Sequence, residues 1–191
     1  MIPIIHWTRF TDYHKIADKI GMRGAVYGFV FNNKMPSPCD CPSDFEGCVY
    51  IGESGGPRAF YYDKQNGHKG KVRTHLHKRM TAHHKPLTTG ECSEKKYELF
   101  KEKYGFGDDV LNGTLTDTPL WVGFITPPKE DPDHCIKSWL ISREHYEIYQ
   151  YQRKFGRSPL MNMQVDGKGK DPNSYSSEIM QNYGALDAFM S

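Results

Sequence analysis

Two short segments with the pattern of buried strands, each carrying a tyrosine near a glycine, constrain the fold of this chain most strongly. Segment 25–31 reads AVYGFVF, and a period of two places its three aromatic residues on one strand face. Segment 48–52 reads CVYIG and returns as a second strand, which is expected to end at Gly52. The loop between them is rich in Pro, Ser and Asp. The segments therefore predict a β-hairpin with an inserted loop, with Tyr27 and Tyr50 on neighbouring strands.

Helical spacing of apolar residues and one more strand pattern complete the predicted fold. Helices are expected at 10–20, 71–84, 93–104 (capped by Ser93) and 132–155, and a third strand at 118–126. This order predicts the α/β (α+β) class, with a small three-stranded antiparallel or mixed sheet flanked by helices. The length of 191 residues suits a single domain over 1–191.

Composition narrows the environment of the protein. Its 37% hydrophobic and 13% aromatic content is that of a globular chain. No apolar run approaches the length of a membrane span, and the N-terminus is apolar for only four residues after Met1, which argues against a signal peptide. Five cysteines, an odd number, are typical of a reducing compartment, so a cytoplasmic protein without membrane partners is expected.

The net charge is only +2, but one block of the chain is strongly basic. Residues 64–85 contain five lysines, two arginines and five histidines, and no acidic residue. Such a block commonly binds phosphate, because each cation near a polyanion releases a counterion. A solvated basic face is the alternative, and composition leaves both open.

The predicted helix at 71–84 carries two Arg–His pairs, each spaced by four residues. Arg79 and His83 lie beside the core-facing apolar stripe, and Arg73 and His77 lie further round the helix. Arginine is suited to clamp phosphate oxygens, and a histidine one turn away could orient water or bind a tyrosine hydroxyl. Nonspecific contacts to a nucleic-acid backbone are the plainer reading of both pairs.

The last predicted helix places a carboxylate within an apolar row. Four of its residues stand four apart: Ile136, Leu140, Glu144 and Ile148. A carboxylate on a core-facing stripe is costly unless it is paired or metal-bound. Glu147 is a second candidate, more easily read as a rim residue. A buried salt bridge from Glu144 to Arg143 or Lys137 is the structural alternative, as is a pair with Arg79.

Taken together, five motifs in chain order resemble the GIY-YIG nuclease superfamily. They are GAVY, VYIGES, LHKRMTAH, REHYEI and PLMN, beginning at residues 24, 49, 76, 143 and 159. The resemblance covers about 24–162 and implies insertions at about 32–47 and 87–117, a layout closest to the GIY-YIG restriction endonucleases. Single motifs of this kind are weak, and their shared order carries the argument.

The resemblance implies hydrolysis of a DNA phosphodiester with Mg²⁺ or Mn²⁺ as the cofactor. It implies a catalytic set of Tyr27, Tyr50, Arg79, His83 and Glu144, with Glu144 also the metal ligand. Arg79 would offset charge in the transition state. Tyr27 is preferred as the base that activates water and Tyr50 as a positioning residue, although the sequence does not separate these two roles. A tyrosine ionises near pH 10 and needs nearby positive charge to act as a base at neutrality.

Double-stranded DNA is the expected partner, bound by a homodimer at least on DNA. The residues expected to contact nucleic acid are Lys71, Arg73, His77, Lys85 and Asn162. Only about thirty residues follow Asn162, which favours a compact, site-specific, type II-like restriction enzyme over a homing enzyme. A freestanding phage, homing or repair-type nuclease and a non-catalytic nucleic-acid-binding domain of the same fold remain alternatives.

Three cysteines raise the question of structural zinc. Cys39 and Cys41 form a Cys-x-Cys pair, Cys48 follows, and Cys92, Cys135 or a histidine could supply a fourth ligand. The pair lacks the two-residue spacing of most zinc knuckles, and Cys48 falls in a predicted strand. Structural zinc is therefore not expected.

Overall fold

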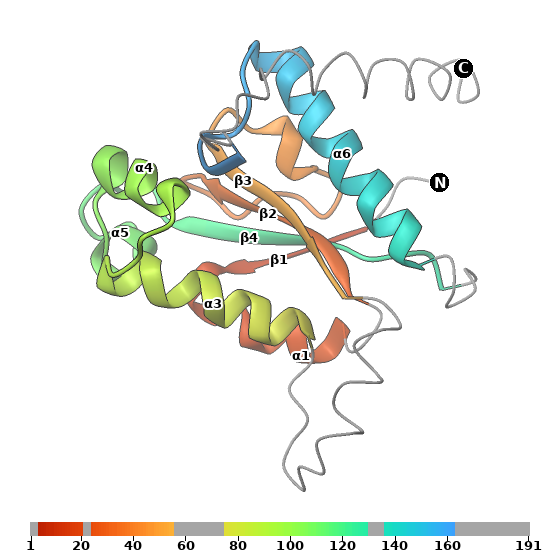
Figure 1. The fold of residues 1–191 in the computed structure, drawn as a ribbon, viewed down its shortest axis with the longest axis horizontal. Coiled ribbons are helices and arrows are strands. Elements are labelled where there is room, and N and C mark those ends of the chain that lie inside the picture. The colour runs from red at the N-terminus through yellow and green to blue at the C-terminus, as the bar shows by residue number, and fades with distance from the viewer. Residues whose placement is uncertain (1–3, 21–23, 56–74, 130–135, 163–191) are drawn as a thin grey trace, which may run out of the picture.

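The computed structural model of the chain describes residues 4–20, 24–55, 75–129 and 136–162. It is a mixed α+β fold around one antiparallel sheet in the order β1-β4-β2-β3 (Figure 1). The strands are β1 (Ile5–Arg9), β2 (Ala25–Phe31), β3 (Cys48–Ser54) and β4 (Leu120–Ile125). The expected antiparallel pairing of the two tyrosine strands is confirmed.

The prediction of a three-stranded sheet was wrong, because β1 adds a fourth strand beside β4. Ile5 pairs with Ile125, and the strand alternates, with Ile5 and Trp7 buried and His6 exposed. Only two side chains of so short an edge strand face the core, so its alternation is a weak signal in the sequence. The partner strand lies about 120 residues away in the chain, where no local pattern indicates the pairing.

Helices cover both faces of the sheet, α1, α3, α4 and α5 on one face and α6 on the other (Figure 1). They are α1 (His14–Ile20), α3 (His75–Thr89), α4 (Lys95–Tyr104), α5 (Asp108–Asn112) and α6 (Ile136–Phe155). Short 3₁₀ turns lie at η1 (Phe10–Asp12), η3 (Pro42–Asp44) and η4 (Leu160–Asn162). In the described ranges no helix is long and apolar enough to cross a membrane.

The alternation predicted for β2 is confirmed, and it divides the core in two. Tyr27 and Phe29 pack toward α3 and α4, whereas Val26 and Val30 pack toward α6. A bulge then shifts the register between β2 and β3. Phe29 pairs with Tyr50 but Val30 pairs with Cys48, so β3 has one extra residue at this point. The regular pairing of Phe29 with Tyr50 places Tyr50 on the same face as Tyr27, and the bulge adds its neighbour Val49 to that same core cluster.

Three element ends differ from the sequence-based expectation. β3 does not end at Gly52 but continues to Ser54, because Gly52 remains paired with Tyr27. Ser93 does not cap α4, whose N-cap is Glu94 and makes no side-chain cap bond. The described part of the helix expected at 71–84 is α3, which continues to Thr89, and residues 71–74 lie outside the described ranges.

Candidate active site

The two strand tyrosines meet above a glycine. The ring centroids of Tyr27 and Tyr50 are 5.9 Å apart, and their hydroxyls are hydrogen-bonded to each other. Gly52 lies opposite Tyr27, and a Cβ atom there would stand 2.7 Å from the Tyr50 ring and 2.8 Å from its hydroxyl oxygen. Real Cβ atoms essentially never approach so closely. Gly52 therefore provides the space in which the Tyr50 ring lies across the strand toward Tyr27.

Helix α3 brings Arg79 and His83 to these hydroxyls. Its Leu76 and Met80 are fully buried, as the apolar stripe predicts. The Nε atom of Arg79 donates to the Tyr27 oxygen at 3.4 Å, and Arg79 also hydrogen-bonds Tyr50. The Nε2 atom of His83 lies 2.9 Å from the Tyr27 oxygen. The structure thus places the Arg79 and His83 pair at the tyrosines.

Of the other predicted pair, His77 contacts Tyr13 and not the two strand tyrosines. The His77 ring packs edge-on against Tyr13, 5.6 Å between centroids, on the side of α3 that faces α1. Its partner, Arg73, lies outside the described residues.

Burial dominates the electrostatics of the cluster. It raises the pKa of Tyr27 well above its ordinary value, a change to which Tyr50 adds and which Arg79 opposes. Burial lowers the pKa of His83 well below its ordinary value, and the positive charges of Arg79 and Lys96 act in the same direction. The His83 imidazole is therefore neutral at pH 7, with one ring nitrogen protonated.

Helix α4, within the inserted segment 87–117, contributes two residues that sequence reasoning missed. The Tyr97 hydroxyl lies 2.8 Å from Nδ1 of His83, and burial raises the pKa of Tyr97. The Lys96 ammonium lies 5.8 Å from the Tyr50 ring centroid. Tyr97 follows His83 by 14 residues with no motif that links them, so only the packing of α4 on α3 reveals the contact.

Glu144 lies at the edge of the sheet formed by β3, within electrostatic reach of Arg79. It is half-buried, and its carboxylate is hydrogen-bonded to the backbone of Glu53. Burial raises the pKa of Glu144 to about 7, and the negative charge of Glu53 adds to this. The charges of Lys137 and Arg79 oppose the rise. Glu53 was missed, although it lies within the VYIGES motif, because its alternation points it away from Tyr50.

The salt-bridge partners differ from those expected for Glu144. Lys137 forms an ion pair with Glu53, and Arg143 pairs with Glu147 at 2.6 Å. The reading of Glu147 as a rim residue was wrong: it is fully buried and accepts a hydrogen bond from Ser43 at 2.5 Å. The inserted loop 32–47 carries Ser43 and covers this part of α6, so the Glu147 side chain is shielded from solvent.

Asn162 is bound to the same edge strand. Its Oδ1 accepts from the backbone N–H of Ile51 at 2.7 Å, and its Nδ2 donates to the Ile51 carbonyl at 2.6 Å. This side chain closes a stretch of the β3 edge that would otherwise be unpaired, two residues before the position where Glu144 binds. A role of Asn162 in binding nucleic acid stays a prediction.

The remaining predicted DNA contacts are placed only in part. Lys85 is exposed on α3, so a polyanion could reach it. Lys71 lies outside the described residues.

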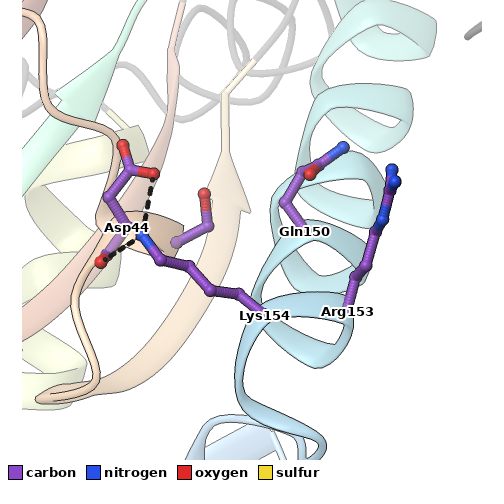
Figure 2. Close-up of a pocket in the computed structure, with 5 residues that line it drawn as sticks. Asp44, Gln150, Arg153 and Lys154 are labelled. Atoms are coloured by element: carbon purple, nitrogen blue, oxygen red, sulfur yellow. Dashed lines mark hydrogen bonds and ion pairs between the residues drawn. The ribbon is translucent and has the colours of Figure 1, made fainter.

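A pocket of about 310 Å³ lies elsewhere, between η3 and the second half of α6 (Figure 2). It is lined by Ser43, Asp44, Gln150, Arg153 and Lys154. Figure 2 shows Lys154 reaching from α6 to Asp44, where its ammonium lies 2.9 Å from the backbone oxygen and 3.5 Å from the carboxylate. None of the five predicted catalytic side chains lines this pocket. The pocket lies between the inserted loop and α6 and is separate from the tyrosine cluster.

The cysteines named as zinc candidates lie in different surroundings. Cys39 is exposed, Cys41 is half-buried beside Arg143, and Cys48 is buried with its thiol near the Tyr50 carbonyl. Across 4–20, 24–55, 75–129 and 136–162, no three His, Cys, Asp or Glu side chains are grouped to hold a metal ion. Cys135 lies outside these ranges.

Comparison of the chain with known protein families, curated proteins and solved structures finds no match. The candidate site therefore stands on its own geometry. That geometry joins two phenols, a guanidinium, a neutral imidazole and a carboxylate from β2, β3, α3 and α6.

Proposed function

We propose that this protein is a metal-dependent DNA endonuclease that hydrolyses phosphodiester bonds with a GIY-YIG-type site. One observation carries the proposal. Arg79 hydrogen-bonds Tyr27 and Tyr50 on one side, and its charge lowers the pKa of Glu144 on the other. The candidate base and phosphate clamp are therefore in contact, and the candidate metal ligand lies within electrostatic reach of the same guanidinium.

The surroundings of Glu144 fit a hard divalent cation. Burial and a neighbouring carboxylate raise the pKa of Glu144 to about 7, so a bound cation would favour its ionised form. Among the described residues no three-ligand group accompanies it, which suits Mg²⁺, an ion that keeps several waters and takes one or two carboxylates plus substrate phosphate. Mn²⁺ prefers the same oxygen ligands. When bound, the metal would supply Lewis-acid stabilisation of the phosphate oxygens.

The protein's own groups have separable roles in this proposal. Arg79 is held by phenol oxygens rather than by a carboxylate in the described part of the chain, so its charge is available to a phosphate. Tyr27, the preferred base, is fully buried, and burial opposes its ionisation. Arg79 counters that effect by donating to the Tyr27 oxygen. Tyr50 completes the pair as the residue that positions water or phosphate.

The biological type proposed is a site-specific, type II-like restriction endonuclease. The described part of each chain offers one such cluster, so cutting both strands at one site favours a homodimer on two-fold symmetric DNA. The inserted segments 32–47 and 87–117 are the candidates for base reading and subunit contact. A phage, homing or repair-type nuclease and a non-catalytic DNA-binding domain are the outcomes that a cleavage assay separates.

The deciding experiment incubates long viral DNA with the purified protein and Mg²⁺ and separates the products on a gel. Discrete bands are expected from wild type, and none from Glu144→Gln, which should still bind DNA because it loses only a negative charge. Asp12→Asn, which removes a partly exposed charge on η1 outside the inserted segments, is the matched control and should cut normally. A smear would indicate a nonspecific nuclease. If a circular plasmid is used as the substrate instead, nicked circles alone would indicate a monomer acting on one strand. Failure to cut any DNA or RNA would contradict the catalytic proposal.

A further inference from the structure

The Tyr97 hydroxyl has one hydrogen-bond partner among the described residues, the Nδ1 atom of His83 at 2.8 Å. Tyr97 is only 6% exposed. A buried hydroxyl whose proton has no acceptor is costly, and such groups are almost always paired. Donation from the Tyr97 hydroxyl to Nδ1 uses this proton and satisfies both groups.

That donation decides where the ring proton of His83 lies. The neutral imidazole carries one N–H, and the partner of one nitrogen sets the state of the other. With Nδ1 accepting from Tyr97, the proton is on Nε2, which lies 2.9 Å from the Tyr27 oxygen. The Tyr27 oxygen then accepts from both His83 and Arg79, and its own proton is directed to the Tyr50 hydroxyl.

We infer that Tyr97, from the inserted helix α4, is a positioning residue that acts through His83 on Tyr27. By holding the ring proton on Nε2, it gives the Tyr27 oxygen a second donor and so stabilises the tyrosinate form. The inference rests on the proposed function. In the reaction, the tyrosinate takes one proton from water while the water oxygen bonds to phosphorus and the scissile P–O bond breaks. Solvent protonates the leaving oxygen, and Tyr27 returns its proton to solvent.

The first test reads the ring proton directly and needs no cleavage activity. Histidine ¹⁵N shifts are recorded for wild type, Tyr97→Phe and Tyr104→Phe, and the His83 signals are identified by their loss in His83→Asn. Tyr104 is the matched control, a tyrosine of the same helix whose ring packs against Phe31 and Phe100. The expected result is an Nε2–H tautomer in wild type and Tyr104→Phe, and a mixture in Tyr97→Phe. An Nδ1–H tautomer in wild type would overturn the inference.

The second test separates positioning from binding. Single-turnover cleavage by Tyr97→Phe should fall about 10- to 100-fold, the usual range for a residue that orients a reacting group's partner. Its Kd for DNA should stay within about twofold, because the phenol carries no charge that contacts phosphate. Tyr104→Phe should change neither quantity. A normal cleavage rate in Tyr97→Phe, or a loss confined to Kd, contradicts the positioning role. If wild type cuts no DNA, the proposed function fails together with that role, whereas the ring-proton assignment is still decided by the ¹⁵N shifts.

Discussion

Each face of the sheet holds an arginine against polar partners, but the two arginines differ in whether a carboxylate neutralises their charge. On the face covered by α6, Arg143 pairs at 2.6 Å with Glu147, a fully buried carboxylate that also accepts from Ser43. On the face covered by α3, Arg79 is bound by the hydroxyls of Tyr27 and Tyr50. A guanidinium neutralised by its own carboxylate has little attraction for a further anion, whereas one held by phenols keeps its charge for a phosphate. The comparison teaches that the Arg143 site is closed by its own carboxylate, whereas Arg79 is held by phenols and not by a carboxylate of the described residues.

Helix α6 contributes to both faces through two glutamates one turn apart. Glu147 points into the closed network, and Glu144 reaches the β3 edge, where its pKa is raised to about 7. The same residue type on the same helix therefore serves stability at one position and, in our proposal, chemistry at the other. The following predictions test that division, from the largest expected effect to the smallest.

Arg79→Ala should lower the cleavage rate by about 10²- to 10³-fold, corresponding to about 2.7–4 kcal/mol of lost electrostatic stabilisation. DNA binding should weaken much less, because other cations are expected to share the contacts to the DNA backbone. Lys85→Ala is the comparison on the same helix: it should reduce affinity in a salt-dependent way and leave the single-turnover rate unchanged. Cleavage rates and Kd values at two salt concentrations check both. Equal loss of binding and rate in Arg79→Ala would mean that the charge serves attachment only.

Glu147→Ala should lower the free energy of unfolding by about 3 kcal/mol, because it leaves Arg143 without its buried partner. Glu144→Ala should change it by less than about 1 kcal/mol, since the group is half-buried and lies at the sheet edge. Urea unfolding followed by tryptophan fluorescence measures the difference. If both variants lose similar stability, the division between a structural and a functional glutamate is wrong.

Gly52→Ala and Gly28→Ala should each destabilise the fold by about 1–3 kcal/mol, the usual cost of overpacking. The new methyl group would meet the Tyr50 ring at 2.7 Å in the first variant and the Pro42 Cβ at 2.3 Å in the second. Only Gly52→Ala displaces a predicted catalytic side chain, so only it should lower cleavage per folded molecule. Unfolding free energies paired with single-turnover rates test this, and a loss of rate in Gly28→Ala would show that the face covered by α6 also affects the site.

Acid should destabilise the tyrosine face through His83. Its pKa in the folded protein lies well below the ordinary value near 6.5, so the stabilising contribution is present above pH 6.5. As the pH falls below 6.5, the unfolded chain binds a proton that folded His83 does not. The free energy of unfolding should then fall by at most about 1.4 kcal/mol per pH unit. The stability difference between wild type and His83→Asn, measured from pH 7.5 to 5, should narrow accordingly. A constant difference would contradict the burial of a neutral imidazole.

The fold and the site differ in how far local patterns could predict them. A period of two correctly divided Tyr27 and Phe29 from Val26 and Val30, and a period near four correctly placed Leu76 and Met80 in the core. The same reasoning failed for Glu147, because the loop that buries it comes from about 100 residues earlier in the chain. The Tyr97 contact to His83 was missed for a related reason: a hydroxyl has no periodicity that indicates its partner.

By itself, the sequence determined the two tyrosine strands, the positions of the main helices and which helix and strand faces are apolar. These are local properties, since side-chain periodicity follows from the backbone geometry of a single element. The tertiary structure decided the fourth strand and which glutamate is buried. It also decided that Arg79 and His83 meet the tyrosines. These outcomes depend on contacts between residues about 50 to 120 positions apart, whose partners are chosen by packing and charge compensation across the whole core.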